Sequence, residues 1–243
     1  MAHLYITDQH GPFALGAQLS LTDEEAHHAL TVSRLHVGEN VMVTDGRGHL
    51  AHTTVTSANK REIVTKVTES SFQEAPTPQV WLAQALAKGD RDEYAIQMSC
   101  ELGIDGIVPF AAERSVSVWS GDKKIKGQQR WQKIMQEAAK QSLRPWIPQV
   151  AGIHTLEELL HEYHDWTLVV MDPDAIPPLS GFIAPSDDPI LIVVGPEGGL
   201  SPAELDACHR FGAQAYRLGE TVLRTSSAGP SALAVLNVRL GRW

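Results

Sequence analysis

The chain of 243 residues is poor in cysteine, in early basic residues and in long apolar runs. Its two cysteines, Cys100 and Cys208, have no C-x-x-C partner, which excludes a disulfide framework and favours buried thiols in a reducing compartment. The first twenty residues contain no lysine or arginine, and no segment reaches the roughly 20 apolar residues of a membrane span. We therefore expect a soluble, cytoplasmic protein without a membrane partner.

Several motifs of common sites are also absent. The chain contains no G-x-G-x-x-G, no G-x-x-x-x-G-K-[ST] and no G-x-S-x-G, so dinucleotide, P-loop and α/β-hydrolase sites are not indicated. The H-E-Y-H at 161–164 lacks the H-E-x-x-H spacing of a zinc site, and the histidines at 27–28 cannot both face one metal on a helix. The proline in D-P-D at 172–174 favours a polar turn. We expect no metal site.

Basic residues are in deficit over the chain as a whole. There are 20 lysines and arginines against 29 aspartates and glutamates, and the net charge of −9 is unusual for a nucleic-acid binder. The basic residues are unevenly spread, because residues 88–144 hold ten against eight acidic ones, whereas residues 145–243 hold five against twelve. This distribution suits a protein that reads a folded RNA at one face, although a solvated helix face would give the same pattern.

Hydrophobic patterning predicts two domains. Residues 1–72 contain short alternating runs, at 41–44 and 63–67, and the hairpin sequence D-G-R-G at 45–48, with one helix from 23 to about 33. These features predict a small β-rich domain, followed by a proline-containing linker within 70–78.

The second domain, 76–243, is predicted to be α/β. Strand-like runs alternate with helix-like ones, which argues for a mainly parallel sheet with helices on both faces. The expected strands are 80–87, 106–110, 167–171, 190–194 and 215–218, and the expected helices are 90–102, 128–143, 156–163, 202–211 and 231–240.

The most informative segment is 190–204, where an unbroken run of β-branched and leucine residues leads into a glycine-rich loop (195–200) and then a helix. Such a run indicates a strand covered on both faces. S-x-x-E at 201–204 has the spacing of a capping box, and Pro202 falls at the first helical position. This arrangement is typical of a nucleotide or cofactor crevice, although an ordinary strand-to-helix turn would share it. Glu197 would repel a phosphate, which favours a neutral or cationic ligand.

Several motifs together resemble a known family. They are V-G-P-E-G-G at 194–199, L-G at 218–219, L-R-T at 223–225, K-G-D-R at 88–91, E-L-G-I at 101–104 and D-G-R-G at 45–48. In order and spacing they resemble the SPOUT methyltransferases, and within them the family that methylates N3 of a uridine in small-subunit ribosomal RNA. The resemblance covers nearly the whole chain.

The resemblance implies a fold and a cofactor. The second domain would contain a trefoil-knotted parallel sheet, the first would be a small PUA-like β-barrel, and the chain would form a homodimer through the C-terminal domain. No periodicity in the chain indicates a knot. S-adenosylmethionine would bind among three loops at the knot, and the implied cofactor-binding residues are Met171, Val194, Gly195, Pro196, Gly198, Gly199, Leu218, Gly219, Val222, Leu223 and Thr225.

The implied activity is S-adenosylmethionine-dependent methylation of N3 of a specific uridine in 16S ribosomal RNA. Uracil N3 carries a proton that must leave, so the site needs a proton acceptor or groups that stabilise charge on O2 and O4. The catalytic candidates are Arg224, which would face the RNA or the cofactor carboxylate, and Glu197, although a glutamate in a turn more often caps its own helix. No metal is required.

The implied partner is 16S ribosomal RNA or the small ribosomal subunit. A paired uridine cannot present N3, so the target must be unpaired or extruded from its helix. Basic side chains are expected to contact RNA phosphates, which position the RNA without reading its sequence. The expected RNA-binding residues are Arg34, Arg47, Lys60, Arg61, Lys88, Arg91, Arg114 and Arg144.

Three positions depart from the common pattern of the family. Many members have glutamate at the positions of Ser226 and Lys140, and lysine is common at the position of Met98. The departures at Ser226 and Lys140 keep one alternative open, a non-catalytic RNA-binding or ribosome-assembly protein that uses the cofactor fold as a scaffold. The other alternative is methylation of another RNA, such as transfer RNA or large-subunit RNA, which related SPOUT families perform.

Overall fold

The computed structural model describes residues 3–59 and 61–243, and the chain divides into two compact units. Unit 1 runs to Ala75 and also includes Ala139–Ile147, whereas unit 2 consists of Pro76–Ala138 and Pro148–Trp243. The expected domain ranges, 1–72 and 76–243, assign residues 139–147 to the second domain, whereas the structure groups them with unit 1.

Unit 1 is built on a five-stranded sheet with strand order β1-β3-β4-β5-β2. β1 pairs parallel with β3, and the other neighbours pair antiparallel. Along β5 the buried residues Ile63, Thr65 and Val67 alternate with more exposed ones, as in a strand with one face on the core. The elements are β1 (Leu4–Ile6), β2 (Gln18–Thr22), α1 (Asp23–Thr31), β3 (Asn40–Thr44), β4 (His49–Ala58) and β5 (Glu62–Phe72).

The segment 139–147 packs into unit 1 through polar contacts that join distant parts of the chain. Trp146 Nε1 donates to the carbonyl of Gln73 at 2.7 Å, and the Thr44 hydroxyl donates to the carbonyl of Pro145 at 2.9 Å. Lys140 forms an ion pair with Glu25 at 2.7 Å. Thr44 and Pro145 are 101 positions apart, so no local pattern in the sequence predicts this packing.

Unit 2 contains a parallel sheet with strand order β12-β10-β11-β6-β7-β8, to which β9 adds beside β7. The strands are β6 (Val80–Ala85), β7 (Gly106–Ala111), β8 (Gln149–Val150), β9 (His154–Thr155), β10 (Thr167–Met171), β11 (Ile190–Val194) and β12 (Gln214–Tyr216). The helices are α2 (Arg91–Glu101), α3 (Asp122–Gln141), α4 (Leu156–Glu162), the short 3-10 helix η1 (Leu179–Gly181), α5 (Pro202–Arg210) and α6 (Thr225–Arg239).

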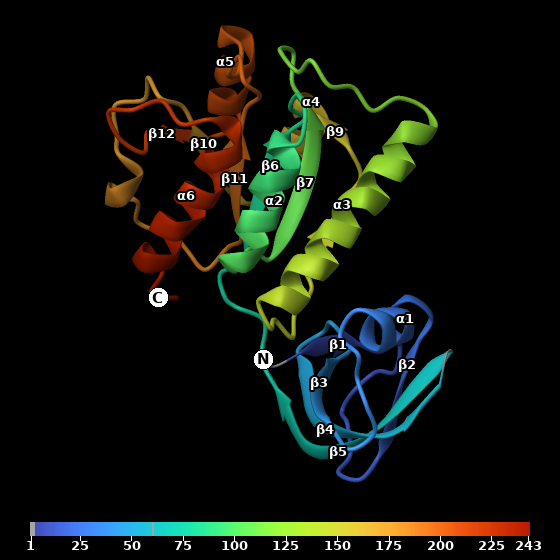
Figure 1. Ribbon diagram of the computed structural model, residues 1–243. Coiled ribbons are helices and arrows are strands. Elements are labelled where there is room, and N and C mark those ends of the chain that lie inside the picture. The colour runs from blue at the N-terminus through green and yellow to red at the C-terminus, as the bar shows by residue number, and fades with distance from the viewer. Residues whose placement is uncertain (1–2, 60) are drawn as a thin grey trace. The chain divides into compact units, whose positions relative to one another are not determined.

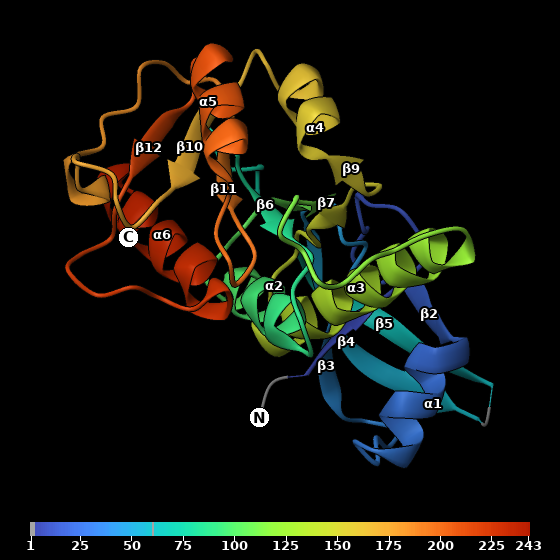
Figure 2. The same cartoon turned by 90° about the horizontal axis from the view of Figure 1, so that it is seen from above.

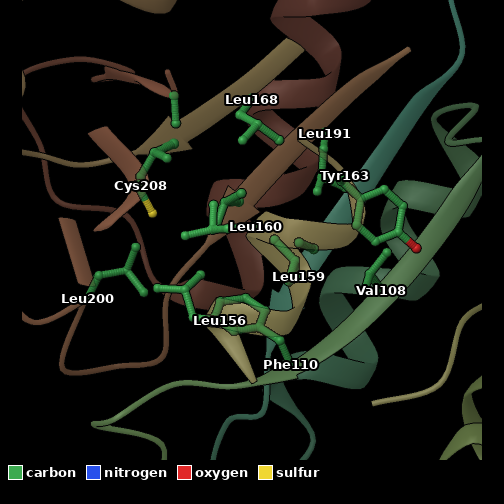
Figure 3. Close-up of a cluster of buried hydrophobic side chains, with 14 of the residues drawn as sticks. Val108, Phe110, Leu156, Leu159, Leu160, Tyr163, Leu168, Leu191, Leu200 and Cys208 are labelled. Atoms are coloured by element: carbon green, nitrogen blue, oxygen red, sulfur yellow. The ribbon is translucent and has the colours of Figure 1, made fainter. Parts of the chain in front are cut away.

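Helices cover both faces of this sheet. Helices α2 and α6 lie on one face, and α4 and α5 lie on the other (Figures 1 and 2). On the second face, Leu156, Leu159 and Leu160 of α4 and Cys208 of α5 meet strand residues such as Val108 in a buried cluster (Figure 3). All five residues of β11 are buried, which confirms the strand covered on both faces that its apolar run predicts.

Two helices begin earlier than their sequence predicts. α6 begins at Thr225 rather than at residue 231. The prediction began the helix after Pro230 because a proline usually marks a helix boundary, but in the structure Pro230 lies inside the helix. α3 begins at Asp122 rather than at residue 128. Its first turns contain Gly127, which is unfavourable inside a helix, and Ile125 is their one apolar residue, so no apolar period marks them. Among the described residues, no helix combines the length and the apolar content needed to cross a membrane.

Candidate functional site

A pocket of about 440 Å³ opens in unit 2 where the carboxyl ends of β10, β11 and β12 meet. This is the edge of a parallel sheet at which ligands normally bind. The loops that follow these strands supply most of its wall. The lining residues include Met171, Asp172, Pro173, Asp174, Val194, Gly195, Pro196, Glu197, Gly198, Gly199, Leu200, Tyr216, Arg217, Leu218, Gly219, Thr221, Val222, Leu223 and Thr225. All eleven residues expected to bind the cofactor therefore lie in one pocket.

The glycine-rich loop needs its glycines for close backbone contact. Gly199 has φ +67° and donates its N–H to the carbonyl of Pro196 at 2.9 Å, which closes a tight turn. A Cβ atom at Gly195 would lie 3.0 Å from the Leu200 nitrogen, closer than nearly all such contacts. By contrast, a Cβ at the exposed lining residue Gly219 would meet no atom of the described residues within 4 Å.

The helix after the loop begins as expected. Ser201 Oγ accepts from the Glu204 N–H at 3.3 Å, and Glu204 Oε2 accepts from the Ser201 N–H at 2.8 Å. The capping box is thus complete, and Pro202 occupies the first turn of α5. The other carboxylate oxygen of Glu204 accepts from the Glu113 N–H at 2.8 Å, which ties this helix start to the loop after β7.

The side-chain contacts of Glu197 are not those of a helix cap. Its Oε1 accepts from the backbone N–H of Lys88 at 2.9 Å and from Arg91 Nη1 at 2.6 Å. Partial burial acts to raise the pKa of Glu197, but the N–H groups of Glu197 and Lys88 and the Arg91 guanidinium outweigh it and hold the pKa below its ordinary 4.5. A carboxylate held in this way is a weak proton acceptor.

Arg114 also contacts the glycine-rich loop. Its Nη1 donates to the carbonyl of Gly198 at 2.8 Å and lies 3.4 Å from the carbonyl of Leu200. The residue lines the pocket as well. Two of the basic residues expected to contact RNA therefore contact this loop, Arg91 through Glu197 and Arg114 through main-chain carbonyls.

Two hydrogen bonds made by buried polar side chains connect three elements at the glycine-rich loop. Gln84, at the end of β6, donates from Nε2 to the Thr225 hydroxyl at 2.8 Å. That hydroxyl in turn donates to the carbonyl of Gly195 at 2.8 Å. The start of α6 and the start of the glycine-rich loop are thereby fixed to the central sheet. Sequence reasoning missed Gln84, for which a polar residue within an apolar strand run is the available signal.

The loop after β12 forms the most open part of the wall. Arg217 N donates to the carbonyl of Pro177, and Leu179 N donates to the carbonyl of Arg217 at 2.8 Å, so this loop packs on the segment after β10. Val222 is 78% exposed, and its apolar side chain lines the pocket. Arg224 lies at the N-cap of α6 with an exposed side chain, next to the lining residues Leu223 and Thr225.

The D-P-D segment is a turn, as its proline predicts. The Asp174 N–H donates to Asp172 Oδ1 at 3.0 Å, the local bond typical of an aspartate turn. Both aspartates also line the pocket. Among the described residues, no group of three or more histidines, cysteines, aspartates or glutamates is arranged to hold a metal ion.

Four of the expected RNA-binding residues belong to the part of unit 1 that the structure describes. Asp45 organises the loop that carries Arg47, because its carboxylate accepts from the N–H groups of Gly11 and Arg47 at 3.1 and 2.8 Å. Arg47 also forms a β-bridge with Trp146. The other three residues are Arg34, Arg61 and Arg144, and Lys60 lies outside the described residues.

Comparison with known proteins gives a consistent result. An RNA methyltransferase domain matches residues 73–237, and an RNA methyltransferase PUA domain matches residues 21–68. The ribosomal RNA small subunit methyltransferase E of Mycobacterium bovis is 35% identical over 233 residues, which cover 94% of this chain and 89% of that protein. The chain belongs to the ribosomal RNA small subunit methyltransferase E family. The Bacillus subtilis member is 34% identical over 227 residues, 90% of this chain and 89% of its own.

The fold of this family is the fold observed here. A crystal structure of the Neisseria gonorrhoeae member, bound to S-adenosyl methionine, has a TM-score of 0.88 and 28% identity, and the match covers 98% of both chains. The predicted family is confirmed, as are the PUA domain and the parallel sheet with flanking helices.

Proposed function

We propose that this protein transfers a methyl group from S-adenosylmethionine to N3 of a uridine in 16S ribosomal RNA. The single observation that carries the proposal is the pocket at the ends of β10, β11 and β12, which gathers all the residues expected for that cofactor. Relatives named for small-subunit ribosomal RNA methylation at 34–35% identity support the substrate class.

The pocket fits S-adenosylmethionine in size and chemistry. Its volume of about 440 Å³ falls in the range of roughly 300–1,000 Å³ that is usual for small-molecule sites. Apolar residues such as Met171, Val194 and Leu223 line the pocket together with the glycine-rich loop, which suits an adenine ring and a ribose. The open space beside Gly219 leaves room for the ligand to approach the backbone.

The chain's residues have three proposed roles, which are to bind the cofactor, to act on the uracil and to hold the RNA. Met171, Val194, Gly195, Pro196, Gly198, Gly199, Leu218, Gly219, Val222, Leu223 and Thr225 would bind the cofactor. When bound, S-adenosylmethionine supplies an electrophilic methyl group on a positively charged sulfur. Arg224, exposed at the start of α6, would contact the RNA and stabilise negative charge on the uracil as N3 loses its proton. Placing the two substrates in line is expected to supply much of the rate.

The basic residues would hold the RNA by its phosphates. Arg34, Arg47, Lys60 and Arg61 fall within the matched PUA domain, which supports their role in unit 1. Lys88, Arg91 and Arg114 border the pocket loops and would act near the target nucleotide, and Arg144 would act from unit 1. Phosphate contacts of this kind weaken uniformly as salt rises.

We also infer the remaining features that the resemblance implies. The loops that line the pocket would be parts of a trefoil knot, and the protein would work as a homodimer through its C-terminal domain. The protein would act in the cytoplasm, which suits a ribosomal RNA substrate.

The first experiment measures S-adenosylmethionine binding to the purified full chain by calorimetry, with S-adenosylhomocysteine as comparison. Gly219→Leu fills open space in the pocket, so we expect it to abolish binding while the protein stays folded. Methylation assays on separated 16S, 23S and transfer RNAs, with the modified base mapped by mass spectrometry, then identify the substrate. Product in transfer RNA alone would move the assignment to another RNA, and binding of neither ligand by a folded protein would favour the non-catalytic scaffold.

A further inference from the structure

An ion pair ties the glycine-rich loop to the start of α2. Glu197 belongs to the loop itself, and Arg91 is the first residue of α2. We infer that Arg91 and Glu197 are positioning residues that keep the glycine-rich loop in the conformation that binds S-adenosylmethionine. This inference rests on the proposed function and adds a role for two residues that sequence reasoning assigned to RNA binding and to catalysis.

Geometry favours a positioning role for Arg91. Among the described residues, the set that lines the pocket includes Glu197 but not Arg91. Arg91 Nη1 reaches Glu197 Oε1 at 2.6 Å, and the side chains of the two residues are 43% and 29% exposed. The contact of Arg91 with the pocket wall therefore runs through Glu197 and the loop that carries it.

The backbone contact makes the pair more specific than an ordinary surface ion pair. Glu197 Oε1 also accepts from the Lys88 N–H at 2.9 Å, so one oxygen bridges a main-chain donor of the loop between β6 and α2 and the guanidinium of Arg91 at the start of α2. A main-chain donor cannot swing away as a lysine side chain can. The carboxylate thus fixes a point of the glycine-rich loop against a neighbouring strand end of the same sheet.

The alternative role of Glu197 as the base that accepts the N3 proton fits these contacts less well. A general base works best when its pKa lies near the operating pH. Here the Oε1 atom already accepts two donors, one of them positively charged. Such donors stabilise the ionised carboxylate and lower its basicity.

The test compares four variants of the full chain by calorimetry with S-adenosylmethionine. Arg91→Ala should raise the Kd roughly threefold to fivefold, which matches the usual worth of an exposed ion pair. Glu197→Ala should raise it about tenfold, because the contact with the Lys88 N–H is lost as well. The double variant should bind no more weakly than Glu197→Ala, since both changes remove the same interaction.

Arg130→Ala is the matched control. Arg130 pairs with Glu93, which is also on α2, but neither residue contacts the glycine-rich loop or lines the pocket among the residues described. We expect its Kd to equal that of the wild type. Equal Kd values for Arg91→Ala and the wild type would overturn the inference.

Steady-state kinetics separates positioning from catalysis and from RNA binding. For Arg91→Ala and Glu197→Gln we expect a raised KM for S-adenosylmethionine and a kcat within about twofold of the wild type at saturating cofactor. A kcat lower by roughly 10²-fold or more in Glu197→Gln would assign Glu197 as a base and overturn its positioning role. An Arg91→Ala variant that changes only the KM for RNA would overturn the positioning role of Arg91.

A different result would refute the proposed function itself, and the inference with it. That result is folded wild-type protein that binds neither S-adenosylmethionine nor S-adenosylhomocysteine.

Discussion

The side-chain amide of Gln84 donates a hydrogen bond to the hydroxyl of Thr225 at 2.8 Å, although 141 positions of sequence separate them. Both residues are buried, and the same hydroxyl donates to the carbonyl of Gly195. One hydroxyl therefore joins the central strand β6, the start of α6 and the glycine-rich loop. This hydroxyl and the Glu197 carboxylate thus tie the glycine-rich loop to other elements at two points.

Replacing Thr225 by valine is expected to destabilise the protein. The substitution keeps the shape of the side chain but leaves one N–H of Gln84 and the carbonyl of Gly195 without this partner in a buried environment. We expect a loss of about 1–3 kcal/mol in the free energy of unfolding, measured by urea denaturation. Thr225→Ser, which keeps the hydroxyl, is the control and should lose less. A valine variant as stable as the wild type would show that the hydrogen bonds contribute nothing.

The ion pair of Glu197 predicts a dependence on pH. Because the pKa of Glu197 lies below its ordinary 4.5 in the folded protein, its contribution to stability is present above pH 4.5 and is lost as the pH falls through the lower folded value. The difference in unfolding free energy between the wild type and Glu197→Gln should therefore stay constant from pH 7 to about pH 5 and shrink in more acidic solution. A difference that grows on acidification would contradict the assigned shift.

The two cysteines are expected to be unreactive in the folded protein. Burial, with a smaller contribution from Glu204, raises the pKa of the Cys208 thiol to about 11, so only about one molecule in a thousand carries a thiolate at pH 8. Cys100 is completely buried. Titration with a disulfide reagent at pH 8 should detect no fast thiol in native protein and two in guanidinium chloride. A fast native thiol would mean that one of these sites opens readily.

The pair of Lys140 and Glu25 is expected to stabilise unit 1. The two side chains are only 8% and 19% exposed, and removal of one partner leaves the other charge in a poorly solvated place. We expect Glu25→Gln to lower the free energy of unfolding by roughly 3 kcal/mol, and the double variant with Lys140→Met to lose less than the sum of the single changes.

An exposed pair provides the control for this cycle. Arg217 and Glu220 lie 3.0 Å apart, and Glu220 is 92% exposed, so Glu220→Gln should leave the stability almost unchanged. Additive effects of the two single changes at Glu25 and Lys140 would mean that these side chains do not interact energetically.

The parts of the site that the sequence predicts are those built by local rules. The run at 190–194 is apolar without interruption and forms a strand buried on both faces. S-x-x-E at 201–204 forms both bonds of its capping box. Strand, loop and helix start are each decided by neighbours within a few residues, so patterns of spacing are sufficient to predict them.

The contacts that support the site join residues far apart in the sequence, so no motif with a fixed spacing predicts them. Glu197 meets Arg91 across 106 positions, so a glutamate in a turn looks equally suited to capping, catalysis or an ion pair. The start of α6 is mispredicted for a similar reason. A proline at 230 is a helix breaker by propensity, and the packing of α6 on its neighbours overrides that preference.

The return of residues 139–147 to unit 1 has a consequence for synthesis of the protein. Trp146 and Pro145 complete contacts with Gln73 and Thr44, yet they leave the ribosome after β6, α2 and β7 have been made. The amino-terminal sheet can begin to fold first, as amino-terminal domains usually do. It reaches its final packing only when more than half of the chain has emerged. The unit that begins to fold first therefore needs residues made much later to complete its folding.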